Sequence, residues 1–355
     1  MRIPIKIAQT TDIRLSQFFS NVDFLPLSDN NLTVQIGRPR KILFVEGSIW
    51  LSDNDNQVLA FDMKGNFVRR IGRPGPGPME IDELTDFSVN EHTGKILVVC
   101  KTKLKCFDID GNFLFGKSVD FIATHYEYLR DGRLLVDFGL NGFHPKEQDG
   151  FGRNLWILDD SFQVVQKVQK YDIDFFSSFD YSNANSQFSK YNGQLLIRPD
   201  FNDTVYYFEH DQLLPQYVFD YGIKSLPFSY LKSNGYSGGK FKKEDYCHLV
   251  EVHEAKNFLL STTSFAGEMY ISIIEKPDFK NVFTQRAMRV ISDLDGLPIR
   301  NFYGTDNKGS FVGILYPEDL LEAKEQGKIK SYKLEELSRK IKEGGNPILV
   351  FYSPK

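Results

Sequence analysis

Short apolar runs separated by turn residues recur along the whole chain. Five of these runs are apolar at their centres and follow a turn, at residues 48–52, 95–99, 133–137, 194–198 and 257–261. Runs of this length and composition are typical of β-strands that are buried on both faces. The pattern therefore predicts an all-β chain built from many short strands.

A strand–turn–strand unit follows each run and repeats along the chain. The sequence Phe-Asp-x-x-Gly-Asn-Phe occupies residues 61–67 and again residues 107–113, and weaker copies begin near residues 155, 205 and 269. Glycine permits a positive φ in such a turn, and Asp or Asn beside it bonds to local backbone. A unit repeated about every 50 residues is typical of propeller blades. We therefore predict one domain over residues 1–355, an all-β, six-bladed β-propeller.

The sixth blade is one strand short in this interpretation. Its strands are expected at residues 300–304, 310–315 and 347–352, whereas residues 22–27 have the pattern of a strand and precede the first blade. We predict that this N-terminal strand completes the sixth blade. Such closure would remove an exposed sheet edge.

One region between two strands of the sixth blade has a helical pattern. Residues 317–327 begin with proline and end with glycine, which are typical helix boundaries. Leu334, Leu337 and Ile341 then lie on one face of a second helix. We predict a helical insertion over about residues 317–344, at the rim of the ring, with this apolar stripe packed on the propeller or on a partner.

The charge balance and hydropathy exclude some functional classes. The chain has 43 basic and 47 acidic residues, a net charge of −4, so we expect no nucleic-acid partner. No apolar run is long enough for a transmembrane segment. The first residues contain no apolar stretch of signal-peptide length, which fits a cytoplasmic protein or a mature chain with an added Met.

The cysteine content argues against a disulfide framework. There are three cysteines, Cys100, Cys106 and Cys247. Cys100 and Cys106 flank a predicted hairpin, so a bridge between them is conceivable, and two reduced core thiols are the alternative.

The chain resembles a family of six-bladed propellers related to NHL repeats. The resemblance depends on Ile-Gly-Arg-Pro-Gly-Pro-Gly-Pro-Met-Glu at residues 71–80, and also on the N-terminal strand and on residues 345–350. Family members usually have Gly where this chain has Met79. The family is known mainly from anaerobic Gram-negative bacteria and is largely uncharacterised. The resemblance implies an extracytoplasmic protein, in the periplasm or attached to the outer membrane, and it implies no catalytic residues.

Two loops are candidate ligand sites. Residues 72–80 join the outer strand of blade one to the inner strand of blade two, and there Arg73 and Glu80 offer polar groups. Alternatively, these two side chains pair with each other and the loop only shapes the crossing between blades.

The second candidate is the long loop at residues 138–153. His144 and Arg153 lie there beside Phe143 and Phe151, a combination suited to a sugar ring or an anionic group. A variable surface loop is the alternative. Because both segments should open on the same face of a propeller, we predict ligand binding on that face.

No catalytic or metal-binding motif is present. The chain has no Gly-x-Ser-x-Gly sequence, and its histidines lack His-x-x-x-His spacing. We predict a binding or interaction module, monomeric and without cofactor or metal ion, whose partner is a glycan, peptide or protein. The alternative is a channel-centred enzyme, a metal-dependent lyase or a lactonase-like hydrolase, with residues drawn from several blades.

Overall fold

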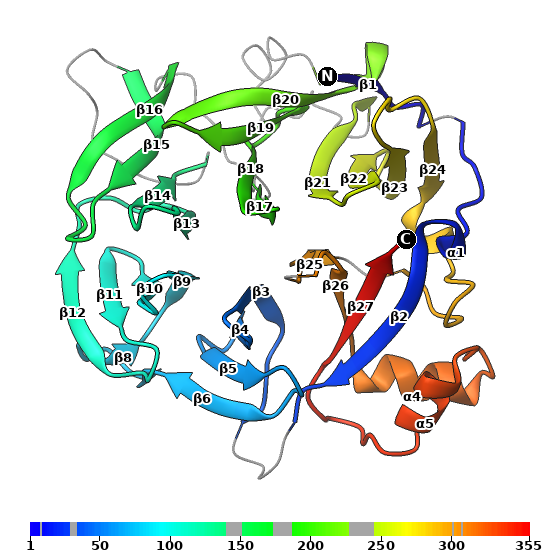
Figure 1. The fold of residues 1–355 in the computed structure, drawn as a ribbon, viewed down its shortest axis with the longest axis horizontal. Helices are drawn as coiled ribbons and strands as arrows, with labels where there is room; N and C mark the ends of the chain where they lie inside the picture. The colour runs from blue at the N-terminus through cyan, green and yellow to red at the C-terminus, as the bar shows by residue number, and fades with distance from the viewer. Residues whose placement is uncertain are drawn as a thin grey trace.

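A computed structural model of the chain shows a ring of six β-sheets around a central channel (Figure 1). The structure describes residues 1–7, 9–28, 34–139, 151–172, 187–226, 245–299, 302–306 and 308–355. In each sheet, four antiparallel strands succeed one another from the channel to the rim. The predicted six-bladed β-propeller is confirmed.

The first three blades follow one another along the chain. Blade one comprises β3 (Pro39–Val45), β4 (Ser48–Asp53), β5 (Val58–Asp62) and β6 (Phe67–Ile71). Blade two comprises β9 (Leu84–Val89), β10 (Ile96–Cys100), β11 (Lys103–Phe107) and β12 (Phe113–Ser118). Blade three comprises β13 (His125–Tyr128), β14 (Leu134–Asp137), β15 (Phe151–Leu158) and β16 (Val164–Asp172). Two short strands, β7 (Arg73–Pro74) and β8 (Glu80–Ile81), pair in the crossing between blades one and two.

The last three blades include strands from the N-terminus. Blade four comprises β17 (Gln187–Tyr191), β18 (Gln194–Arg198), β19 (Thr204–Glu209) and β20 (Gln212–Asp220), with β1 (Arg2–Pro4) added at its rim. Blade five comprises β21 (His248–Glu254), β22 (Phe258–Phe265), β23 (Glu268–Glu275) and β24 (Val282–Arg286). Blade six comprises β25 (Phe302–Thr305), β26 (Phe311–Leu315), β27 (Ile348–Pro354) and β2 (Phe19–Pro26). The 3-10 helices η1 (Gly222–Lys224) and η3 (Ala287–Arg289) follow the rim strands of blades four and five.

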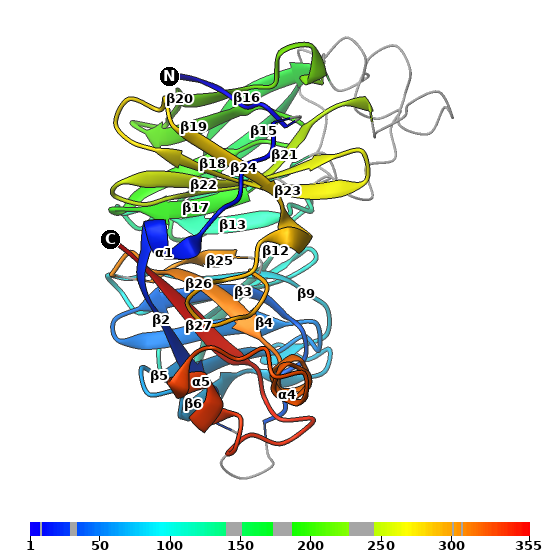
Figure 2. The ribbon, with the colours of Figure 1, turned by 90° about the vertical axis from the view of Figure 1, so that its right-hand side faces the viewer.

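The N-terminal segment, residues 1–26, contacts each of the last three blades. β1 pairs in parallel with β20 of blade four. The chain then passes blade five, where the backbone N–H of Ile13 donates to the Gln285 side chain at 2.8 Å. A short helix, α1 (Leu15–Phe18), leads into β2, which pairs with β27 (Figures 1 and 2). The predicted closure is confirmed, and the extra strand on blade four is an addition that the sequence analysis does not contain.

The hydrophobic core is divided among the interfaces between neighbouring blades. Trp50, Phe87 and Phe107, for example, are buried together between blades one and two. Leu15 and Phe19 of the N-terminal segment enter the cluster between blades five and six. Each blade therefore completes its burial only when both neighbours are in place.

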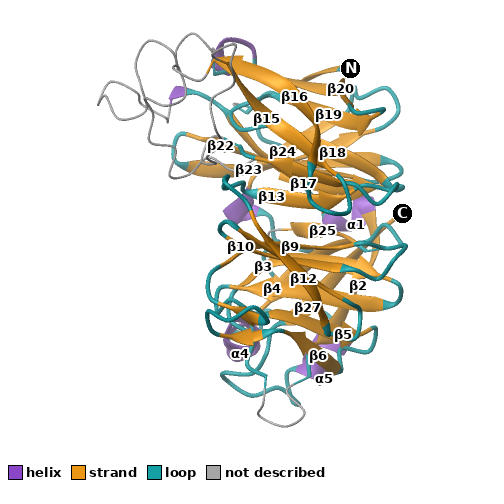
Figure 3. Ribbon diagram, turned by 90° about the vertical axis from the view of Figure 1, so that its left-hand side faces the viewer, coloured by secondary structure: helices purple, strands orange, loops and turns teal. Residues whose placement is uncertain are grey.

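The helical insertion lies at the rim of blade six, between β26 and β27 (Figures 1 and 3). It contains α4 (Pro317–Glu325) and α5 (Tyr332–Leu337). Leu334 is fully buried, and Leu337 and Ile341 pack half-buried against the same core cluster. The packing of the predicted apolar stripe on the propeller is confirmed, but α5 ends at Leu337, so Ile341 contributes from the turn that follows the helix.

The repeated sequence motif forms the turn between the third and fourth strands of a blade. In blade one, the Asp62 carboxylate accepts hydrogen bonds from the backbone of Lys64 at 2.8 Å and of Asn66 at 2.9 Å. Gly65 has a φ of 83°, the left-handed conformation for which glycine is favoured. In blade two, the Asp108 carboxylate likewise accepts the backbone N–H of Asn112 at 2.8 Å, and also its side-chain amide at 2.8 Å.

Gly65 also lies against the strand that closes the ring, and this contact can be tested. A Cβ at Gly65 would lie 2.3 Å from the carbonyl oxygen of Pro26, whereas a Cβ at Gly47, with a φ of 75°, would have nothing within 4 Å. We expect Gly47→Ala to lower the free energy of unfolding by about 1 kcal/mol through backbone strain alone, and Gly65→Ala by roughly 3 kcal/mol. Urea unfolding of both variants measures the difference, and equal losses would contradict the role of the contact.

Candidate functional site

Different connections form the two faces of the ring. Because strands within a blade alternate in direction, the first–second and third–fourth strand turns lie on one face, which we name the turn face. The crossings between blades and the second–third strand connections lie on the opposite face, which we name the crossing face. Of the loops proposed from sequence, residues 72–80 belong to the crossing face, as do the described backbone ends of the second loop at residues 138–139 and 151–153.

On the crossing face, Arg73 and Glu80 contact each other. Arg73 Nε lies 3.7 Å from Glu80 Oε1, and the other carboxylate oxygen of Glu80 accepts the Gly77 N–H at 2.9 Å. The buried Lys105 Nζ donates to the Gly77 carbonyl at 2.9 Å. The loop is thus held by Glu80 and by Lys105 of β11, and the contact of Arg73 with Glu80 agrees with the pairing that the sequence left open.

The second proposed loop is described only in part. Phe143 and His144 lie outside the described residues. The backbone of Arg153 lies in β15 opposite Lys170, and the side chain of Arg153 is also outside the described set. Ligand binding by Arg73, Glu80, His144 and Arg153 therefore stays a prediction.

A cavity of about 760 Å³ lies at the channel mouth on the turn face. Its walls include the inner strands of blades one and four and the first turns of blades four and six. Charged and aromatic side chains line it, among them Lys41, Glu127, Lys190, Tyr191, Tyr303 and Lys308. This volume falls within the usual range of small-molecule sites.

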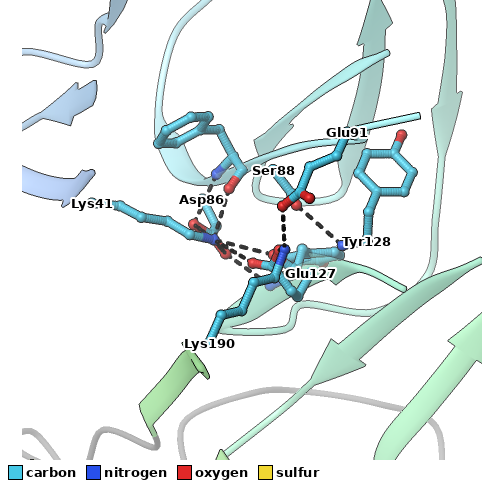
Figure 4. A network of polar contacts seen from close by, with 9 residues as sticks. Lys41, Asp86, Ser88, Glu91, Glu127, Tyr128 and Lys190 are labelled. Atoms are coloured by element: carbon cyan, nitrogen blue, oxygen red, sulfur yellow. Dashed lines mark hydrogen bonds and ion pairs between the residues drawn. The ribbon is translucent and has the colours of Figure 1, made fainter. Parts of the chain in front are cut away.

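Four consecutive inner strands each place one charged side chain in a network beside this cavity (Figure 4). Lys41 of β3 lies 3.1 Å from Asp86 of β9 and 3.6 Å from Glu127 of β13. Lys190 of β17 lies 2.8 Å from the other oxygen of Glu127. The network therefore links blades one to four around the channel.

Hydrogen bonds to the backbone hold the network in place. The Asp86 carboxylate accepts the N–H groups of Tyr126 at 2.7 Å and Phe87 at 2.8 Å. Lys41 also donates to the Phe87 carbonyl at 2.8 Å. Across the channel, the Thr305 hydroxyl of blade six donates to the Lys190 carbonyl at 3.2 Å. The charged groups are thus fixed in position before any ligand arrives.

Glu127 and Lys190 stabilise each other's charged forms. Burial by itself raises the pKa of Glu127, whose side chain is 4% exposed, but the charges of Lys190 and Lys41 outweigh burial and hold this pKa below its ordinary value. Burial lowers the pKa of Lys190, and Glu127 and Glu91 outweigh that effect and raise it. Both groups are therefore ionised near neutral pH, which gives the cavity a fixed carboxylate acceptor and not a proton donor.

The cysteines are buried free thiols. Strand pairing places Cys106 opposite Leu97 and Cys100 opposite Lys103, so the hairpin does not align Cys100 with Cys106. Burial raises the pKa of Cys106 to about 11 and of Cys247 to about 12. Within the described residues, no group of three or more His, Cys, Asp or Glu side chains is arranged to hold a metal ion.

The sequence analysis does not identify the network, because its members are far apart and belong to no motif. A usable signal exists nevertheless. Lys41, Asp86, Glu127 and Lys190 each precede one of the strongly apolar second strands, as a charged residue within an otherwise ordinary strand. In a propeller, the inner strands of successive blades surround the channel, so charged side chains from neighbouring inner strands can meet there.

The ring and its cavity define a six-bladed β-propeller with a network of paired acidic and basic side chains at one mouth of the channel. The chain belongs to the family described as Domain of unknown function (DUF4934), whose model matches residues 2–353. No curated protein matches the sequence. The relation to NHL repeats that the sequence indicates stays a prediction.

Two solved structures from Bacteroides are similar to this chain. One is a "putative exported protein" of Bacteroides fragilis, with 20% sequence identity, 100% coverage of both chains and a TM-score of 0.84. The other is a member of the DUF4221 family of Bacteroides vulgatus, with 12% identity, coverage of 95% of this chain and 97% of that chain, and a TM-score of 0.55. These similarities concern the fold. Within the part of the chain that is described, no helix is long and apolar enough to cross a membrane.

Proposed function

We propose that the protein is a binding module that acts outside the cytoplasm and holds a glycan in the turn-face cavity. The observation that carries the proposal is the mixture of acidic and basic side chains within the cavity. Lys41 and Lys190 pair with Asp86, Glu127 and Glu91, and Lys256, Lys308 and Asp306 also line the cavity, so a ligand need not carry a charge to bind there. Fixed hydrogen-bond donors and acceptors remain, which complement the hydroxyl groups of a sugar.

Aromatic side chains support the same class of ligand. Tyr191 and Tyr303 line the cavity together with Phe44 and Phe188. Aromatic rings offer apolar faces that match the C–H faces of sugar rings, and tyrosine adds a hydroxyl at its edge. The cavity thus combines the two kinds of surface that a saccharide presents.

The state of Glu127 argues against this carboxyl as the general acid of a channel-centred enzyme. A general acid works best when its pKa lies near the ambient pH. The pKa of Glu127 is held below its ordinary value by two lysines. This carboxylate is therefore suited to hold Lys41 and Lys190 in position as hydrogen-bond donors beside the cavity.

We place the protein in the periplasm or attached to the outer membrane. The similarity to a "putative exported protein" supports this location, as does the family resemblance of the sequence. We favour the turn face over the crossing face because Arg73 and Glu80 of the crossing face already engage each other.

Binding to a glycan array, followed by calorimetry on variants, tests the proposal. Lys308 is exposed, lines the cavity and forms no ion pair within the described part of the chain. We expect Lys308→Ala to lower affinity for a bound glycan about tenfold, the effect of losing one hydrogen bond from a charged donor, at an unchanged melting temperature.

Arg73→Ala is the matched control, because Arg73 is an exposed cation on the opposite face. It should leave the affinity for the same glycan unchanged. If Arg73→Ala lowered the affinity and Lys308→Ala did not, the site would lie on the crossing face. A lack of binding to every glycan would refute the proposal.

A further inference from the structure

A second cavity lies beside the first on the turn face, over the seam between blades three and four. Its volume is about 280 Å³, and its walls include the turn between β13 and β14 of blade three and the turn between β19 and β20 of blade four. Five residues line both cavities: Val89, Glu91, Lys190, Gly193 and Leu195. The two cavities therefore open side by side, along one groove from the channel mouth to the seam.

The seam is held by an ion pair between the two blades. Arg133 of blade three bonds both carboxylate oxygens of Asp211 of blade four, at 2.8 and 2.7 Å. The same guanidinium bonds Asp131 at 2.7 Å. One guanidinium thus bonds two carboxylates, and its bidentate contact with Asp211 favours a rigid seam.

Arg130 lines the second cavity and reaches over Gly193, one of the residues that line both cavities and form their junction. Its guanidinium donates to the Asn192 carbonyl at 3.1 Å and lies directly over Gly193. A Cβ at Gly193, whose φ is +70°, would lie 2.0 Å from Arg130 Nη2. Glycine at this position is what allows an arginine to reach the junction, where it can bond a ligand that passes from one cavity to the other.

We infer that the protein binds a linear, neutral oligosaccharide of several units, which extends from the channel mouth across Arg130 to the seam. The inference deepens the proposed function and rests on it. A groove with two adjoining cavities suits an extended ligand better than a single ring. Acidic and basic side chains are mixed along the groove, Glu91, Glu127 and Asp211 with Lys190, Arg130 and Arg133, and this mixture suits a chain that carries no charge.

Calorimetry with short and long sugars tests this inference. The probes are the disaccharides and hexasaccharides of cellulose, amylose, xylan and chitin, with hexagalacturonate as the acidic counterpart. We expect at least one neutral hexasaccharide to bind ten or more times as tightly as its disaccharide. Arg130→Ala should remove that gain and leave the affinity for the disaccharide unchanged, whereas Lys308→Ala should weaken both.

The outcomes separate this inference from the proposed function. Equal affinities for short and long sugars, with Lys308→Ala weakening both, would overturn the extended groove and leave the glycan site at the channel mouth. Tighter binding of hexagalacturonate than of every neutral sugar would overturn the neutral class. Glu209→Gln, an exposed seam position that lines only the second cavity, repeats the test should Arg130→Ala lower the melting temperature.

Discussion

A chain that lacks residues 1–26 is expected to lose more than roughly 5 kcal/mol of unfolding free energy and to aggregate on expression. The deletion removes Leu15, Phe18, Phe19 and Val22, which are buried between blades five and six. It also leaves β27 as an unpaired edge, because β2 is its outer neighbour. Thermal melting and size-exclusion chromatography measure the two effects.

A shorter deletion serves as the control. Removal of residues 1–10 takes β1 from the rim of blade four but leaves β2 in blade six. This variant should be less stable than the intact chain and still form a closed, monomeric ring. A peptide of residues 13–28, added to the longer deletion, should restore part of its stability by strand addition. A monomeric chain without residues 1–26 that melts at the original temperature would contradict closure by β2.

Glu127→Gln is expected to cost about 3–5 kcal/mol of unfolding free energy, the typical effect of removing one partner from a buried ion pair. Its side chain is 4% exposed and faces both Lys190 and Lys41. Glu91→Gln is the matched control, because Glu91 also pairs with Lys190 but is 51% exposed. That substitution should cost less than about 1 kcal/mol. Equal losses would show that the network does not hold blades one to four together.

The pH dependence of this difference follows from the directions of the pKa shifts. A carboxyl whose pKa is lowered in the folded state stabilises the fold above its unfolded pKa, which is about 4.3 for Glu, and loses that effect as the pH falls through the folded pKa. The raised pKa of Lys190 stabilises the fold below about pH 10.4 and loses that effect at higher pH. The gap between the intact protein and Glu127→Gln should therefore be largest between about pH 5 and pH 10 and shrink outside that window.

Local signals explain why the fold was predictable from the sequence. The turn at residues 61–67 is specified by contacts within a few residues, those of Asp62 with Asn66 and the positive φ of Gly65. The second strands are recognisable because both of their faces are buried, as in β10, where every residue is buried. The inner strands are harder to recognise, because one of their faces borders the channel. β3, for instance, mixes buried and partly exposed positions.

The site depends on contacts that no local pattern specifies. Arg130 and Gly193 belong to different blades, and only the folded ring brings the guanidinium over the glycine. The unusual composition of the crossing at residues 72–80 suggests a ligand site, yet glycine and proline also fit a loop that is fixed by Glu80 and Lys105. Unusual composition identifies where the backbone is constrained, and it does not by itself identify a ligand.

The pairing of β2, near the N-terminus, with β27, the last strand, also sets the order in which the ring can fold. Ser20 and Ser353 are hydrogen-bonded at 3.2 Å although 333 residues separate them in the chain. Closing a long loop costs only slightly more entropy than closing a short one, but folding slows as contacts become more distant in sequence. Blades one to five can form from neighbouring hairpins while the chain is still being made, whereas blade six must wait for β27. β2 then stays unpaired until β27 is available, so completion of the ring is a late step of folding.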